Sequence, residues 1–233
     1  MRSHKRIGQV AVIPRLMCRA VTPDAFEALT WKNLSIGKPK EAVSAALSWQ
    51  AIEPFSLRPA GIGSFIAVEH LGNAKLGELF CRRGLIANRG SLALHNNLAV
   101  ALAIQGRVDE AKAELENLKS HSGASERVVN VATQGLIQMR SGNLNEGARL
   151  YEMEIGIAIE NKSRLLWCRA AANYALEYAR YDNAICPKPS HPSRKSSMTL
   201  DDKTKSLASD VPAVLERAKK IRSASKIIEA SEM

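Results

Sequence analysis

Histidine is the residue type in this chain best suited to exchange protons near neutral pH. His70, His95 and His121 lie far apart in the sequence, and no serine, cysteine or carboxylate motif accompanies them. A phosphate-binding loop is not expected at Gly61-Ile62-Gly63, because a third glycine and a preceding strand are missing. We interpret that stretch as a loop and a helix with small side chains. We interpret His95 as a packed, half-buried ring. We therefore expect no catalytic and no cofactor-binding residues, and no enzyme.

The cysteines are the second set of side chains that could carry chemistry. Cys18, Cys81, Cys168 and Cys186 include no C-x-x-C pair, and no histidine stands at a metal-ligand spacing from them. Cys81 and Cys168 fall at apolar helical positions, where free cysteine behaves as a small hydrophobic residue. We expect no metal site, and a reduced, cytoplasmic environment is the simplest context for free thiols.

The net charge of +10 suggests an acidic partner, but its distribution weakens that interpretation. Residues 1–22 carry five basic and no acidic side chains, and residues 187–233 carry ten basic and six acidic ones. The body between them therefore has a net charge of only +1, which argues against nucleic acid as the partner. No apolar stretch approaches the ~20 residues that a membrane-spanning helix needs, so we expect no membrane segment.

A short segment recurs about every 35 residues and predicts the architecture. Each copy begins with glycine and has alanine or glycine at its sixth position; a fifth, starting at Ala179, begins with alanine instead. Periodicity of this length indicates a helical repeat array, in which each unit buries its apolar face against its neighbours. The four glycine-led copies are Gly37-Lys38-Pro39-Lys40-Glu41-Ala42, Gly72-Asn73-Ala74-Lys75-Leu76-Gly77, Gly106-Arg107-Val108-Asp109-Glu110-Ala111 and Gly142-Asn143-Leu144-Asn145-Glu146-Gly147.

Each glycine marks a turn between two predicted helices, because it permits the positive φ that ends a helix. In the third unit, Leu98 and Leu102 are large core residues of the first helix. Ala99 and Ala111 are the small residues at which the two helices cross, since only a small side chain lets the backbones approach closely.

This pattern resembles the tetratricopeptide repeat family over roughly residues 23–186. The closest match is the third unit, with Leu98-Ala99-Val100-Ala101-Leu102 before its turn segment. The fourth unit departs from the family pattern, with Gln134 and Gln138 at apolar positions. The resemblance implies an all-α fold, a right-handed solenoid of about five helix-turn-helix repeats. The pentatricopeptide repeat has a similar period, but it reads RNA and would need a basic groove.

The resemblance also implies a concave groove lined by the first helix of each unit. Asparagine amides there could hydrogen-bond an extended peptide, with Arg140 and Arg169 as anchors for anions. The central groove positions are Asn96, Asn97, Val100, Thr133, Leu136, Arg140, Arg169 and Asn173. Further positions of the same kind are Trp31, Ile66, Glu69, His70, Ile104, Met139 and Glu177.

The two ends of the chain lie outside the repeat pattern. We expect residues 1–22 to form a disordered basic leader, and the proline- and serine-rich residues 187–210 to form a flexible linker. Residues 211–230 follow an Asp-Val-Pro start signal and predict an amphipathic, basic C-terminal helix.

Three functions remain open from the sequence. The first is a protein-interaction scaffold that binds a protein or peptide in the groove, without a small-molecule substrate. The second is a regulatory or accessory fragment of a larger protein whose enzymatic or DNA-binding domain is absent here. The third is an RNA-binding helical array.

Overall fold

The computed structural model describes residues 22–119 and 124–181. Over these residues the chain is all-α and no strand occurs, as predicted. The expected linker, the C-terminal helix and all but the last residue of the leader lie outside this range. The helices are α1 (Pro23–Ser35), α2 (Pro39–Ile52), α3 (Leu57–Phe65), the π-helix η2 (Ile66–His70), α4 (Ala74–Ala87), α5 (Leu92–Ile104), α6 (Val108–Lys119), α7 (Ala124–Arg140), α8 (Leu144–Glu160) and α9 (Arg164–Tyr181).

The repeated glycines occupy the turns that the sequence assigns to them. Gly37, Gly72, Gly106 and Gly142 have φ angles of 72°, 65°, 79° and 88°, in the left-handed region that side chains with a Cβ rarely adopt. They follow α1, η2, α5 and α7, and α2, α4, α6 and α8 begin a few residues later. The glycines therefore end the first helix of four consecutive pairs.

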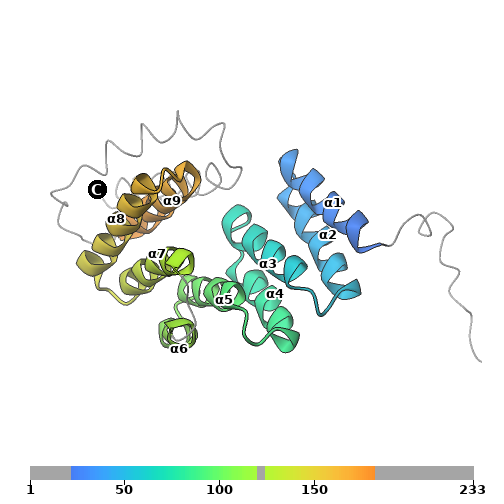
Figure 1. Ribbon diagram of the computed structural model, residues 1–233, viewed down its shortest axis with the longest axis horizontal. Helices are drawn as coiled ribbons and strands as arrows, with labels where there is room; N and C mark the ends of the chain where they lie inside the picture. The colour runs from blue at the N-terminus through green and yellow to red at the C-terminus, as the bar shows by residue number, and fades with distance from the viewer. Residues whose placement is uncertain (1–21, 120–123, 182–233) are drawn as a thin grey trace, which may run out of the picture.

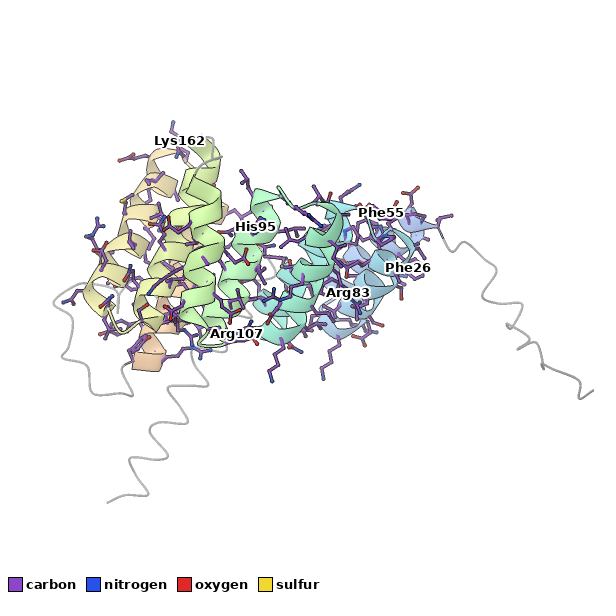
Figure 2. The ribbon with its side chains drawn as sticks, turned by 90° about the horizontal axis from the view of Figure 1, so that it is seen from below. Phe26, Phe55, Arg83, His95, Arg107 and Lys162 are labelled. Carbon is purple, nitrogen blue, oxygen red and sulfur yellow. The ribbon has the colours of Figure 1, made fainter. Side chains whose placement is uncertain are left out.

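The helices pack in chain order along an arc (Figure 1). Each helix contacts the next one, and α3 also packs on α5, α5 on α7, and α7 on α9. The turns gather at two opposite edges: Figure 2 shows Phe55 and Lys162, from turns between pairs, at one edge and Arg107, from a turn within a pair, at the other. The first helices of successive pairs thus lie next to one another.

Small residues let the two helices of a pair approach closely. Ala99 and Ala111 are both fully buried between α5 and α6. In the next pair, a Cβ added to Gly147 would lie 2.4 Å from Met139 Cγ and 2.9 Å from the carbonyl oxygen of Gly135. Small residues therefore occupy the predicted crossing positions, and at Gly147 a larger side chain could not be added without moving backbone.

The core consists mainly of alanine, leucine and other small or aliphatic side chains, with Trp49, Phe80 and Tyr151 fully buried among them. Its largest cluster joins α4 to α9 and includes Leu98, Leu102 and Tyr151. Cys81 and Cys168 form no disulfide and are completely buried, as expected of small apolar core residues. Among the described helices, none combines the length and the apolar character that crossing a bilayer requires.

The second pair differs from the sequence expectation at its first helix. Gly61 and Gly63 lie inside α3, so the predicted loop is wrong. Gly63 is needed for packing, because a Cβ there would lie 2.2 Å from a ring carbon of Phe80. The helix then continues as η2, and such a π-turn commonly lies near a functional site.

Candidate functional site

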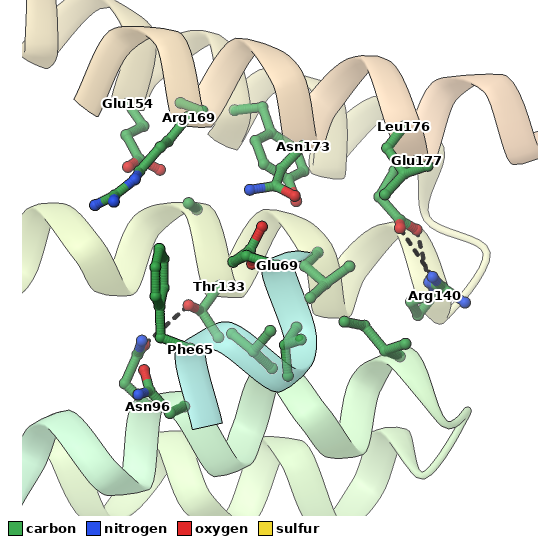
Figure 3. Close-up of a pocket in the computed structure, with 18 of the residues that line it drawn as sticks. Phe65, Glu69, Asn96, Thr133, Arg140, Glu154, Arg169, Asn173, Leu176 and Glu177 are labelled. Carbon is green, nitrogen blue, oxygen red and sulfur yellow. Dashed lines mark hydrogen bonds and ion pairs between the residues drawn. The ribbon is translucent and has the colours of Figure 1, made fainter. Parts of the chain in front are cut away.

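A cavity of about 320 Å³ opens among α3, η2, α5, α7, α8 and α9 (Figure 3). Its wall mixes apolar side chains with amides, carboxyl groups and guanidinium groups. The lining residues are Ser64, Phe65, Val68, Glu69, Gly72, Asn96, Asn97, Val100, Ile104, Ala132, Thr133, Leu136, Arg140, Tyr151, Glu154, Leu166, Arg169, Ala170, Asn173, Leu176, Glu177 and Arg180.

The structure brings all the central groove positions to this one cavity. They come from three helices: Asn96, Asn97 and Val100 from α5; Thr133, Leu136 and Arg140 from α7; Arg169 and Asn173 from α9. Of the further positions, Glu69, Ile104 and Glu177 also line it. The four others lie outside the lining: Ile66 and Met139 are buried in the core, Trp31 is 45% exposed on α1, and His70 is the last residue of η2.

The amides of α5 already make contacts that fix their orientation. Thr133 donates from its hydroxyl to Asn96 Oδ1 at 2.8 Å, a hydrogen bond that links α7 to α5. Asn97 donates from Nδ2 to Ser64 Oγ at 3.0 Å, which links α5 to α3. These bonds hold the cavity wall in place and leave each amide with further hydrogen-bonding capacity.

Arg140 is engaged by a neighbour, so its expected role as an open anion anchor needs correction. It donates from Nε to Glu177 Oε2 at 2.6 Å and from Nη2 to Glu177 Oε1 at 2.8 Å. Both side chains are largely buried, and Arg180 Nε approaches the same carboxylate at 3.6 Å. Burial and then the charge of Arg140 lower the pKa of Arg180. The cluster ties α7 to α9 at one end of the cavity.

Arg169 reaches the opposite end of the cavity in Figure 3. Its guanidinium lies over the ring of Phe65, with Cζ 4.9 Å from the ring centroid. A cation over an aromatic face is favourable, so this contact connects α9 to the last residue of α3. Phe65 was not expected in the lining, because its position in the repeat frame is one usually occupied by a small residue.

Glu154 and Tyr151 reach the cavity from α8, a second helix of a pair, and the sequence analysis missed both. Glu154 is 4% exposed, and its Oε2 has no hydrogen-bond partner. Burial raises the pKa of Glu154 to about 8, against a smaller lowering by a backbone hydrogen bond at Ala132. Burial, followed by the charges of Glu177, Glu154 and Glu69, raises the pKa of Tyr151. The sequence did carry one signal for Glu154. Its carboxyl group falls at helical spacing on the same buried face of α8 as Gly147, Tyr151 and Ala158.

His95 lies outside the cavity and has a carboxylate partner that the sequence did not reveal. Its Nδ1 is 2.5 Å from Glu114 Oε2, and its Nε2 is 2.7 Å from the carbonyl oxygen of Arg89. The ring is part-buried, as expected, and joins α5 to α6. Within the described residues, no group of histidine, cysteine and acidic side chains could hold a metal ion.

The cavity has the features of a recognition site. Its size lies within the range of roughly 300–1,000 Å³ that is typical of ligand sites, with apolar walls and a few convergent polar groups. Its ionisable lining includes three carboxyl groups and three guanidinium groups, so no large excess of one charge sign is available to bind a phosphate backbone. Comparisons with protein-family models, curated proteins and solved structures found no match to this chain.

Proposed function

We propose that this chain is a non-catalytic interaction scaffold of the tetratricopeptide type, which binds a segment of another protein in the cavity. The observation that carries the proposal is the convergence of groove positions from α5, α7 and α9 on one cavity. The resemblance to the tetratricopeptide repeat assigns these positions to the groove. The packing of α3 on α5, α5 on α7 and α7 on α9 supports a solenoid arrangement, and its right-handed sense is part of the proposal.

The composition of the wall favours an extended segment as the ligand. Asn97 and Asn173 offer amide donors and acceptors that match a peptide backbone, while Val100 and Leu136 offer apolar contacts to its side chains. The balanced charges of the lining disfavour the RNA-binding alternative. The fragment alternative concerns what lies beyond this chain and stays open.

A cavity-filling variant tests the proposal. Asn173→Trp places an indole in the cavity from α9, and Asn145→Trp places the same group on the exposed start of α8. The probe is a displayed library of random dodecapeptides, from which binders of the wild-type chain are selected and synthesised. We expect Asn173→Trp to weaken their binding at least tenfold and Asn145→Trp to leave it unchanged, as measured by fluorescence anisotropy.

Two results would contradict the proposal. Selection that enriches no peptide on the wild-type chain removes the basis for a peptide groove. Equal affinity of the Asn173→Trp and wild-type chains moves the binding site away from the cavity. Circular dichroism and thermal melting of both variants establish that the comparison is made between folded proteins.

A further inference from the structure

The carboxyl group of Glu154 has an environment that its place in the fold does not explain. It is 4% exposed, it lines the cavity, and its Oε2 lacks a hydrogen-bond partner. A buried polar atom without a partner destabilises the folded protein, because it has lost its hydrogen bonds to water and gained none in return. Such an atom at the wall of a cavity is satisfied when a ligand brings the missing group.

When Glu154 is ionised, its Oε2 accepts hydrogen bonds only, so a cationic group of a ligand would both satisfy this atom and favour the ionised form. The arginines of the lining already face other groups: Arg140 and Arg180 lie against Glu177, and Arg169 lies over Phe65. Among the side chains that are described and line the cavity, Glu154 is the one with a buried polar atom, Oε2, that makes no hydrogen bond.

From this geometry we infer that the cavity binds a lysine or arginine side chain of the partner segment, with its cationic head on Glu154. This inference rests on the proposed function and specifies the partner's chemistry. A charge-assisted bond to a carboxylate is about twice as strong as a neutral one, which favours a cation over an amide. The apolar part of the cavity wall offers a surface to the aliphatic stem of such a side chain.

The protonation of Glu154 gives this inference a measurable signature. Burial raises the pKa of Glu154 to about 8, so the free protein holds this carboxyl mostly protonated at neutral pH. A bound cation favours the ionised form, so binding releases a proton. Affinity should therefore rise about tenfold per pH unit from pH 6 to pH 8 and level off above it. The other ionisable groups of the cavity are Glu69 from η2, Arg140 from α7, Tyr151 from α8, and Arg169, Glu177 and Arg180 from α9.

The test uses fluorescein-labelled octapeptides with amidated C-termini in a positional-scanning library, and three forms of the full chain. Glu154→Gln keeps the shape of the side chain and removes its charge. Glu160→Gln makes the same change at an exposed position of the same helix. We expect the wild-type and Glu160→Gln chains to select lysine or arginine at one position, by at least tenfold over norleucine. Glu154→Gln should lose that preference and retain the apolar preferences at the other positions.

The outcomes separate this inference from the proposed function. If no peptide pool binds the wild-type chain, the peptide groove and the cation site fail together. If pools bind without selecting a cation, or if Glu154→Gln selects it as strongly as the wild type, the cation site alone is overturned. Selection of asparagine or glutamine with an affinity independent of pH also overturns it, because an amide pairs with the protonated acid without releasing a proton.

Discussion

Glu177 illustrates how a charge is held inside this helical protein. Its carboxylate is 3% exposed and accepts two hydrogen bonds from Arg140, while Arg180 lies 3.6 Å away. Removing one member of a buried pair leaves an uncompensated charge, which costs about 3–5 kcal/mol. Arg140 therefore stabilises the contact of α7 with α9. Its substitution would destabilise the fold, so that a loss of binding could not be distinguished from a loss of folded protein. Asn173 is the better residue with which to probe the cavity.

A second charged cluster predicts how the fold responds to acid. Glu78 on α4 accepts hydrogen bonds from Arg82 at 2.7 Å, from Gln105 at 2.8 Å and from Arg107 at 2.8 Å. Burial alone would raise the pKa of Glu78, but these three bonds outweigh it and lower the pKa to about 2. The cluster thus joins α4 to the turn between α5 and α6.

The sign of the pH effect follows from this lowered pKa. The folded pKa lies below the unfolded value of 4.5, so the stabilisation is complete above pH 4.5 and is lost as the pH falls towards 2. We expect Glu78→Gln to flatten the decline of melting temperature between pH 4.5 and pH 2. The exposed Glu41→Gln on α2 serves as the control and should keep the wild-type slope. Identical slopes for Glu78→Gln and wild type would show that Glu78 does not contribute.

At the scale of elements, α8 carries two glycines that predict opposite effects of the same substitution. Gly147 lies against α7, where an added Cβ would meet Met139 Cγ at 2.4 Å and the carbonyl oxygen of Gly135 at 2.9 Å. Gly156 lies later in the helix with open space around its Cβ position. Comparing the same substitution at Gly147 and at Gly156 therefore separates the effect of close packing between helices from the effect of helix propensity on stability.

We expect Gly147→Ala to destabilise the protein by about 1–3 kcal/mol, because backbone must move to admit the methyl group. Gly156→Ala should stabilise it by about 0.5–1 kcal/mol, since glycine in a helix interior loses more conformational entropy on folding. Urea denaturation with measured midpoints and slopes gives both values. A Gly147→Ala chain as stable as the wild type would mean that α7 and α8 do not cross at this glycine.

The positions of the helix pairs could be predicted from the sequence, because their requirements are local. The turns at Gly106 and Gly142 need a positive φ, which favours glycine. The helix crossings at Ala111 and Gly147 need a small residue. Each requirement restricts the residue type at one position. The π-helix η2 could not be predicted. Gly72 follows Gly37 by 35 residues, one more than a 34-residue unit, and a π-turn absorbs one extra residue. The sequence does not say where along the unit that residue is absorbed.

In the whole molecule, only part of the site could be predicted from the sequence, because some of its residues depend on how several helices meet. The residues of α5, α7 and α9 follow from a repeat frame, since these first helices lie next to one another. Phe65 reaches the cavity next to a π-turn, and Glu154 reaches it from a second helix. Their positions depend on how three or more helices meet, which no single repeat specifies. The same holds for the pairing of Arg140 with Glu177, two residues 37 positions apart.

We propose that α5, α7 and α9 together form a surface that binds a peptide segment. The most direct test is photo-crosslinking with a selected peptide that carries a diazirine in one apolar side chain, followed by mass spectrometry of the crosslinked chain. We expect adducts on cavity residues such as Val100, Leu136 and Asn173, and we expect an excess of unlabelled peptide to abolish them. Specific adducts confined to residues 187–233, or to exposed positions of α6 such as Ala113, would contradict it.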